Sequence, residues 1–184
     1  MTEPYKIIIC GEGGQGALSV AEIIATAAWL QGKHAVCMPF FSTEKRGGVS
    51  MAYVQISDDR IPFPKFNKAD LWVVLSQRSI DRIFSYLQDG TKIVVNSFLV
   101  KDLSRIAAWK PQAIDATSIA RNQFQKPRTF NMIVMGAMLR FIPGLGIEAF
   151  GQALEKVFGG KYERDPALRD LNQQALKAGY DLIK

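Results

Sequence analysis

The chain has 184 residues, of which 48% are hydrophobic, so it can bury one substantial core and is short for two. No apolar run approaches the ~20 residues of a membrane-spanning helix, and the N-terminus lacks the basic region of a signal peptide; we therefore expect a soluble, cytoplasmic protein. Cys10 and Cys37 are too few to ligate an iron–sulfur cluster and are expected to be reduced core residues. The net charge of +6 favours anionic partners or is simply a mildly basic surface, but the scattered Lys and Arg residues do not indicate nucleic acid.

The first predicted elements follow the order strand, helix, strand. Residues 5–10 form a compact apolar run, which is typical of a strand buried on both faces. Residues 17–30, rich in Ala, Ile and Leu, predict a helix that ends before Gly32, and residues 35–38 predict a second strand. This order is the opening of a βαβ unit.

The elements expected after a long loop at 39–48 alternate again and then become helical. Strands are predicted at 49–57, 71–75, 92–96 and 113–115. Helices are predicted at 80–87, 131–141, 147–157 and 166–183, the last three separated by Pro and Gly residues at 143–146 and by glycines at 159–160. The sequence therefore predicts an α/β fold, a single Rossmann-like domain over residues 1–184 with a mixed, mostly parallel sheet flanked by helices.

The glycine-rich segment 11–16, GEGGQG, lies between the first strand and the first helix. Its glycines fit the pattern G-x-G-x-x-G in the context that the pattern requires. Missing Cβ atoms let a ligand approach the backbone, and free amides at a helix N-terminus attract phosphates. The alternative is a tight turn packed for purely structural reasons. The residues predicted to bind a cofactor here are Gly11, Gly13, Gly14, Gln15 and Gly16.

Two common nucleotide sites fit this segment poorly. An NAD-binding fold expects an acid at the end of the second strand to hold the ribose hydroxyls, whereas this strand ends Val-Cys-Met-Pro-Phe at residues 36–40. A P-loop expects Gly-Lys-Ser/Thr after the glycines, and none follows.

The loop after the second strand has an unusual composition, FFSTEKRGG at residues 40–48. A βα fold would place it near the glycine segment, at the carboxyl edge of the sheet. Its guanidinium, on Arg46, could hold a phosphate or carboxylate through two hydrogen bonds, or it could pair with Glu44. The candidate binding residues in this loop are Ser42, Thr43, Glu44, Arg46 and Gly47.

No catalytic residue and no metal site is predicted within the chain. His34 is the only histidine, and neither cysteine has an evident third group to orient a Cys–His pair. Glu12 and Glu44 could act as paired carboxylates if their loops converge, but loop carboxylates are usually solvated.

The combination of these segments resembles the gamma subunits of 2-oxoacid:ferredoxin oxidoreductases, which include pyruvate, 2-oxoglutarate, 2-oxoisovalerate and indolepyruvate enzymes. The resemblance rests on the GEGGQG turn, the EKRGG loop at 44–48, Ala69-Asp70, the stretch NMIVMGA at 131–137, and Asn172, Ala175 and Gly179 in the last helix. It covers nearly the whole chain. The residues before Glu44 differ from the Ser-Tyr-Gly-Pro that many members have, which leaves the substrate subclass open.

The resemblance implies a division of labour among subunits. Alpha and beta subunits would bind thiamine diphosphate and decarboxylate the 2-oxoacid. Iron–sulfur clusters on partners, including a possible ferredoxin-like delta subunit, would pass electrons to ferredoxin. The acyl group would go to coenzyme A, with which the gamma subunit is associated, so this chain would not be catalytic alone and would bind no cofactor tightly. The alternative is a free-standing nucleotide-binding or regulatory module that uses the GEGGQG turn.

Two structural expectations follow. The segments 11–16 and 42–48 should lie on the same edge of one sheet. A subunit that docks on partners should also expose apolar residues at 39–41 and 61–63, since both segments lie beside turns.

Overall fold

The computed structural model describes residues 3–40 and 48–183. Across these residues the strands are β1 (Tyr5–Glu12), β2 (His34–Phe40), β3 (Val49–Ser57), β4 (Leu71–Val74), β5 (Lys92–Asn96) and β6 (Gln112–Ile114). The α-helices are α1 (Ala17–Leu30), α2 (Gln77–Ile83), α3 (Ala116–Asn122), α4 (Phe130–Met138), α5 (Ile147–Tyr162) and α6 (Pro166–Leu182). Short 3-10 segments occupy Phe84–Tyr86, Ser104–Trp109, Pro127–Thr129 and Leu139–Phe141. Within the described ranges, no helix is both long and apolar enough to cross a bilayer.

The strands form one mixed sheet in the order β2-β3-β1-β4-β5-β6. The pairs β1–β4, β4–β5 and β5–β6 are parallel, while β3 runs antiparallel to both of its neighbours, β1 and β2. The predicted α/β class and the mixed, mostly parallel sheet are therefore confirmed.

The position of β2 differs from a simple βαβ unit, because β3 lies between β2 and β1. Composition explains the order. Pro39 has no N–H to give to a ladder, so a strand that contains it belongs at an edge. By contrast, β3 is buried from Met51 to Ser57 and is suited to a central place.

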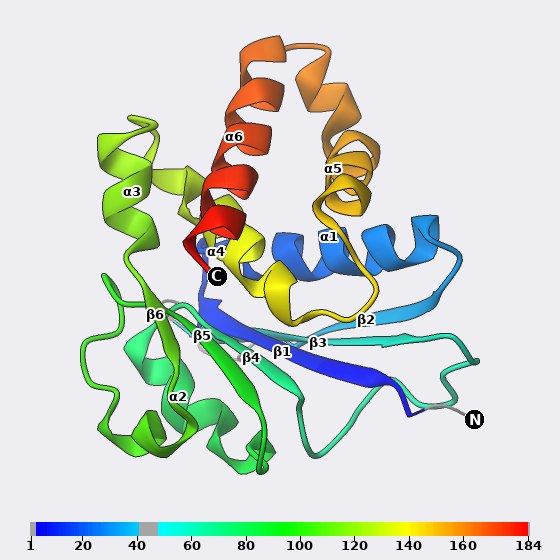
Figure 1. Cartoon of the computed structure of the whole chain (residues 1–184), viewed down its shortest axis with the longest axis vertical. Coiled ribbons are helices and arrows are strands. Elements are labelled where there is room, and N and C mark those ends of the chain that lie inside the picture. The colour runs from blue at the N-terminus through cyan, green and yellow to red at the C-terminus, as the bar shows by residue number, and fades with distance from the viewer. Residues whose placement is uncertain (1–2, 41–47, 184) are drawn as a thin grey trace.

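Helices cover the two faces of the sheet unequally (Figure 1). α1, α4, α5 and α6 lie on one face and α2 lies on the other. Alternate residues of β1 enter two separate hydrophobic clusters: Ile7 and Ile9 pack with the α1 side, and Ile8 and Cys10 with the α2 side. Both faces of β1 are thus buried, as the unbroken apolar run predicts.

Three local predictions need correction. The glycines at 159–160 do not end a helix, because α5 continues to Tyr162, which is buried and accepts a hydrogen bond from Asn172 of α6 (3.0 Å). Tertiary packing of this kind can outweigh the roughly 1 kcal/mol that each helical glycine costs. Helix α3 was not predicted; its N-cap residue is Asp115, whose carboxylate accepts from the Ser118 amide (3.0 Å). The remaining boundaries shift by a few residues, and the predicted helix at 80–87 divides into α2 and a 3-10 segment.

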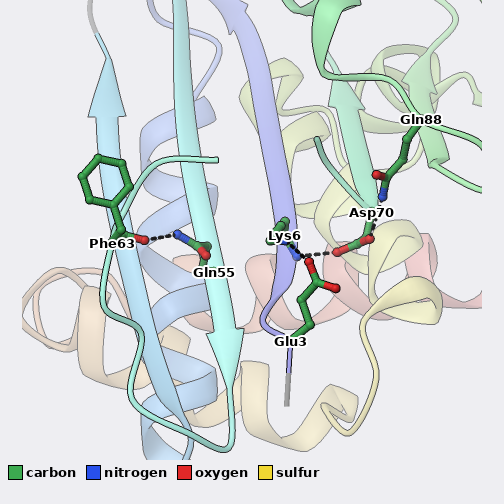
Figure 2. Close-up of polar contacts among 6 residues, drawn as sticks. All are labelled: Glu3, Lys6, Gln55, Phe63, Asp70 and Gln88. Atoms are coloured by element: carbon green, nitrogen blue, oxygen red, sulfur yellow. Dashed lines mark hydrogen bonds and ion pairs between the residues drawn. The ribbon is translucent and has the colours of Figure 1, made fainter. Parts of the chain in front are cut away.

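The amino end of the sheet is fixed by Asp70, which Figure 2 shows beside the start of β1. Its carboxylate accepts from the Lys6 amide (2.8 Å) and from Gln88 Nε2 (3.1 Å), while the Asp70 amide donates to the Lys6 carbonyl oxygen (2.8 Å). The Lys6 ammonium forms an ion pair with Glu3. Ala69-Asp70, part of the family resemblance, therefore aligns β1 with β4 at the end of the sheet opposite the glycine turn.

Candidate anion-binding site

The glycine turn continues β1 beyond its predicted end. Gly11 and Glu12 still pair with Ser50 and Val49 of β3, and the Leu75 amide donates to the Cys10 carbonyl oxygen (2.8 Å) at the end of β4. The chain then reverses, and the Gln15 amide donates to the Glu12 carbonyl oxygen (3.1 Å). The turn consequently lies at the carboxyl edge of the parallel strands, where α/β folds bind their ligands.

The glycines of the turn serve different purposes. A Cβ on Gly11 would lie 2.6 Å from Oε1 of Gln15 and 2.9 Å from Cβ of Leu75, so packing inside the protein excludes a side chain there. Gly16 has φ +82° and lies against Asn131, whose Nδ2 would be 2.5 Å from a Cβ. Gly13 and Gly14 have no atom within 4 Å of the place that a Cβ would take. Packing therefore requires glycine at positions 11 and 16, and Gly14, with φ +88°, is also required by its backbone conformation. Gly13 and Gly14 border open space that a ligand could use, and the ligand contacts predicted for these glycines remain predictions.

Gln15 stabilises the turn through its side chain. Its Oε1 accepts from the Glu12 amide (2.8 Å), in addition to the main-chain bond in the opposite direction. This reciprocal pair holds the backbone of the turn in one conformation. The predicted contact of Gln15 with a ligand remains a prediction.

The N-terminus of α1 opens onto this turn. Gly16 is its N-cap residue, and within the described residues no side chain caps the helix and no acid lies in its first turn. The first amides of a helix have no partner within the helix and carry a partial positive charge. A phosphate or carboxylate is the chemical group that such a site favours.

The second predicted site segment falls largely outside the described residues. This applies to Ser42, Thr43, Glu44, Arg46 and Gly47. The described flanks of the segment are informative: Phe40 pairs with Met51, and Val49 pairs with Glu12 of the glycine turn. The chain thus leaves β2 and enters β3 at the edge where the turn lies. The prediction that both segments share one edge is supported by these flanks, and the contacts of the five residues remain predictions.

The identity of the strand beside β1 explains why the NAD-binding pattern fits poorly. In the NAD-binding fold the acid that holds the ribose stands on the strand next to β1. Here that neighbour is the antiparallel β3, and Val49 stands opposite Glu12. The strand that follows α1 is one place farther away, at the sheet edge.

Several polar residues near the carboxyl edge were not predicted. Asn131 of α4 lies against Gly16, and Ser76 shares a hydrogen bond with Ser79 between their hydroxyl oxygens (2.9 Å). Buried Asn96 donates from Nδ2 to Thr117 Oγ1 (2.9 Å). A polar residue at or directly after a predicted strand, as at Ser76 and Asn96, is the sequence signal that could have identified two of them.

The cysteines and the histidine do not form a nucleophilic site. Cys10 and Cys37 are both free, and they enter the clusters on opposite faces of the sheet. Burial raises the pKa of the Cys10 thiol to about 11, and burial together with Glu22 raises the pKa of the Cys37 thiol. His34 is exposed at the first position of β2, opposite Ser57. Among the residues that the structure describes, no three His, Cys, Asp or Glu side chains are grouped for a metal.

The expected exposed apolar segments are present as far as they are described. Phe63 is 65% exposed, Pro39 and Pro62 are exposed, and Phe40 and Ile61 are half-buried. Phe41 lies outside the described residues. The prediction of exposed apolar residues beside these turns is confirmed for Pro39, Pro62 and Phe63, whereas Phe40 and Ile61 are only partly exposed.

Comparisons with known proteins agree on one family. The family profile described as pyruvate ferredoxin/flavodoxin oxidoreductase matches residues 6–182. The pyruvate synthase subunit PorC of Methanothermobacter thermautotrophicus is 32% identical over 181 residues, covering 95% of this chain and 93% of that subunit. The chain spans only 35% of the length of the ketoisovalerate oxidoreductase subunit VorA of the same organism, to which it is 32% identical over 175 residues.

Solved structures share the fold. The gamma subunit of a keto/oxoacid ferredoxin oxidoreductase from Geobacter sulfurreducens superposes with a TM-score of 0.80 at 28% identity, covering 96% of each chain. A 2-oxoglutarate:ferredoxin oxidoreductase from Magnetococcus marinus, solved with 2-oxoglutarate, coenzyme A and succinyl-CoA bound, shares the fold over 31% of its own length and 99% of this chain (TM-score 0.84, 21% identity). Because the family profile covers nearly the whole chain, from residue 6 to residue 182, this chain belongs to the pyruvate ferredoxin/flavodoxin oxidoreductase family.

Proposed function

We propose that this chain acts within a multi-subunit 2-oxoacid:ferredoxin oxidoreductase and supports the coenzyme A-dependent oxidative decarboxylation of a 2-oxoacid to an acyl-CoA. The observation that carries the proposal is the glycine turn, with its open face at Gly13 and Gly14, in a chain that matches the family from residue 6 to residue 182. The chain would function in the cytoplasm as one gamma-type domain over residues 1–184.

The redox and carbanion chemistry would belong to partner subunits. An iron–sulfur cluster normally needs four thiolates, whereas the chain has two cysteines and they lie on opposite faces of the sheet. The residues of this chain therefore do not fit such a cluster. Alpha and beta subunits carrying thiamine diphosphate, and partner clusters that reduce ferredoxin, with a possible delta subunit among them, would complete the enzyme.

The proposed contribution of this chain is to bind and orient coenzyme A. The phosphates of coenzyme A are anions, and the uncapped amides at the start of α1 would attract one of them. Gly13 and Gly14 would allow close approach to the backbone, and Arg46 would add a guanidinium from the neighbouring loop. The net charge of +6 agrees with an anionic ligand.

A reconstitution experiment tests this function. The chain is co-expressed with the subunits encoded beside it, and 2-oxoacid-dependent dye reduction is measured with and without coenzyme A. We expect a brown complex that contains thiamine diphosphate and requires both coenzyme A and this chain. Full activity of a complex that lacks this chain would contradict the proposal.

The free-standing nucleotide-binding module is the second candidate, favoured by the same turn. It predicts a monodisperse monomer that retains a nucleotide through purification. Co-purification separates the two functions. Capture of a partner that contains thiamine diphosphate favours the oxidoreductase subunit, and a tightly bound nucleotide without a partner favours the free-standing module.

A further inference from the structure

The edge strand β2 is incompletely covered on the face of the sheet that carries α2. Residues Met51 and Tyr53 of β3 point to that face, as do their partners Phe40 and Met38 of the edge strand β2. Figure 1 shows α2 and the loop between β3 and β4 on this side of the sheet. Val36, Met38 and Phe40, which alternate along β2, remain half-buried.

The loop between β3 and β4 displays Phe63 on this face in an ordered way. Gln55, buried in β3, donates from Nε2 to the Phe63 carbonyl oxygen (2.7 Å), and Figure 2 shows Phe63 in front of β2. Phe66 anchors the same loop by packing edge-on against Tyr53, with ring centroids 5.3 Å apart. The Phe63 side chain nevertheless remains 65% exposed. An anchored backbone with an exposed aromatic side chain resembles a surface organised for contact rather than a loose loop.

We infer that an outer-face patch, defined as Val36, Met38, Phe40, Pro62 and Phe63, docks a partner subunit of the complex. The matching surface of that partner would be apolar and bordered by carboxylates. The inference rests on the proposed function, and it names the surface and the chemistry of the partner. Aromatic residues at the centre of an interface contribute most of its binding energy, which makes Phe63 the expected anchor.

Charge around the patch identifies the partner as acidic. Arg82 of α2 lies over the Phe40 ring, 5.5 Å from its centroid, and exposed Arg60 and Lys65 belong to the loop that carries Phe63. Of the nearby acids, Asp58 is bound by Lys33 (2.6 Å). Complementary charge favours carboxylates opposite this basic border.

The same charges disfavour a second copy of the chain as the occupant. In a two-fold dimer through this face, each basic border would meet an identical one, and like charges across an interface are unfavourable. Pairing of a further strand with β2 is also disfavoured, because Pro39 removes one main-chain donor from the edge. The face of the sheet, rather than its edge, is the docking surface.

The test compares two exposed aromatic residues on opposite faces of the sheet. Phe63→Asp alters the patch, and Trp29→Asp is the matched control, since Trp29 is 59% exposed on α1 and lies under Lys156 on the other face. Each chain is purified and titrated into the complex of its partner subunits, and the Kd is measured at low and high salt. Thermal unfolding of each isolated variant provides the folding control.

We expect Phe63→Asp to raise the Kd about a hundredfold and Trp29→Asp to change it less than about threefold, with both chains folded. Arg82→Glu should raise the Kd about tenfold at low salt and less at high salt, because salt screens the border charges. A folded Phe63→Asp chain that binds its partners with the wild-type Kd overturns the assignment, as does equal loss in both aromatic variants. If the wild-type chain forms a homodimer and Phe63→Asp dissociates it, the patch binds a second copy of the chain. That result would overturn the inference of an acidic partner subunit.

Failure of the surface assignment is distinguishable from failure of the proposed function. If the wild-type chain binds no oxidoreductase subunit at all, the proposed function and this inference fall together. If the wild-type chain assembles and restores activity while Phe63→Asp does so equally well, only the surface is wrong.

Discussion

Substituting alanine at two glycines of the turn should separate its structural role from its ligand role. Gly16 has φ +82° and touches Asn131, whereas Gly13 has no neighbour within 4 Å of a Cβ position and no positive φ. Gly16→Ala should therefore destabilise the fold. Gly13→Ala should leave the fold intact and place a methyl group in the space proposed for the ligand.

The structure sets the size of the expected effects. An alanine held in the left-handed region costs about 1–2 kcal/mol, and moving the Asn131 amide away from its rotamer adds about 0.5–1.5 kcal/mol. For a chain of this length, the sum of about 1.5–3.5 kcal/mol lowers Tm by about 3–14 °C. Gly13→Ala restricts the unfolded chain and should change stability by less than about 1 kcal/mol, in the stabilising direction.

The assay pairs stability with ligand use. Thermal unfolding of the isolated variants is followed by circular dichroism, and the coenzyme A dependence of dye reduction is measured in the reconstituted complex. We expect Gly16→Ala to lower Tm, and Gly13→Ala to keep Tm while raising the concentration of coenzyme A that gives half-maximal rate. Asn131→Ala combined with Gly16→Ala should recover only the part of the loss that comes from the clash.

Either of two results would refute this reasoning. A Gly16→Ala chain with wild-type Tm would mean that neither the positive φ nor the Asn131 contact constrains the turn. A Gly13→Ala complex with an unchanged coenzyme A dependence and an unchanged Tm would remove the turn from the ligand site, although the fold would stand.

Three further predictions test separate features. Arg46→Ala should change Tm by less than about 4 °C yet weaken coenzyme A use roughly ten- to a hundredfold, and Arg46→Lys should restore that use only in part. A sharp fall in Tm with a normal coenzyme A dependence would show instead that Arg46 has a structural role. Gly179→Ala should lower Tm by more than about 10 °C, because the new Cβ would overlap the Ile133 carbonyl oxygen where α6 crosses α4. Gly160→Ala is the control, since a Cβ there meets open space and should be tolerated. Equal Tm values for the two variants would contradict the close packing of α6 on α4. Burial raises the pKa of the Cys10 thiol from 9.0 to about 11, so the folded state keeps the thiol proton to a higher pH than the unfolded state does. The stability linked to this proton is present below pH 9 and is lost as the pH rises through 11. Cys10→Ala should flatten the fall of the urea-unfolding free energy over that range, and an unchanged slope would exclude the thiol as a cause.

Sequence patterns were most reliable where local chemistry alone decides the structure. The apolar run of β1, the glycines after it and the Ala-rich helix α1 form one continuous strand–turn–helix unit, as predicted. The limit of the glycine pattern is also clear. The pattern assigned the same role to every glycine, whereas the structure separates them: contacts with Leu75 and Asn131, which are distant in the chain, exclude a side chain at Gly11 and Gly16 but not at Gly13.

Long-range contacts account for what the sequence missed. Helix α5 continues through the glycines at 159–160 to Tyr162, which is buried and hydrogen-bonded to Asn172 of α6, whereas the sequence predicts a break at those glycines. Asn131 joins the turn only because α4 is packed against α1 and α6. Its place in the chain, more than a hundred residues from Gly16, carries no local signal of that contact.

The sequence by itself determined the α/β class, the strand–turn–helix at residues 5–30 and the family, because each depends on short-range patterns of hydrophobicity, glycine and motif spacing. Only the tertiary structure decided that β3 lies between β1 and β2, since strand order depends on which strand can satisfy its main chain and bury both faces. That order has a functional consequence. It puts Val49 where an NAD-binding fold needs an acid, and it puts β2 at the edge, where Met38 and Phe40 stay half-buried and the exposed Phe63 lies in front of the strand, an arrangement that no single segment of the sequence reveals (Figure 2).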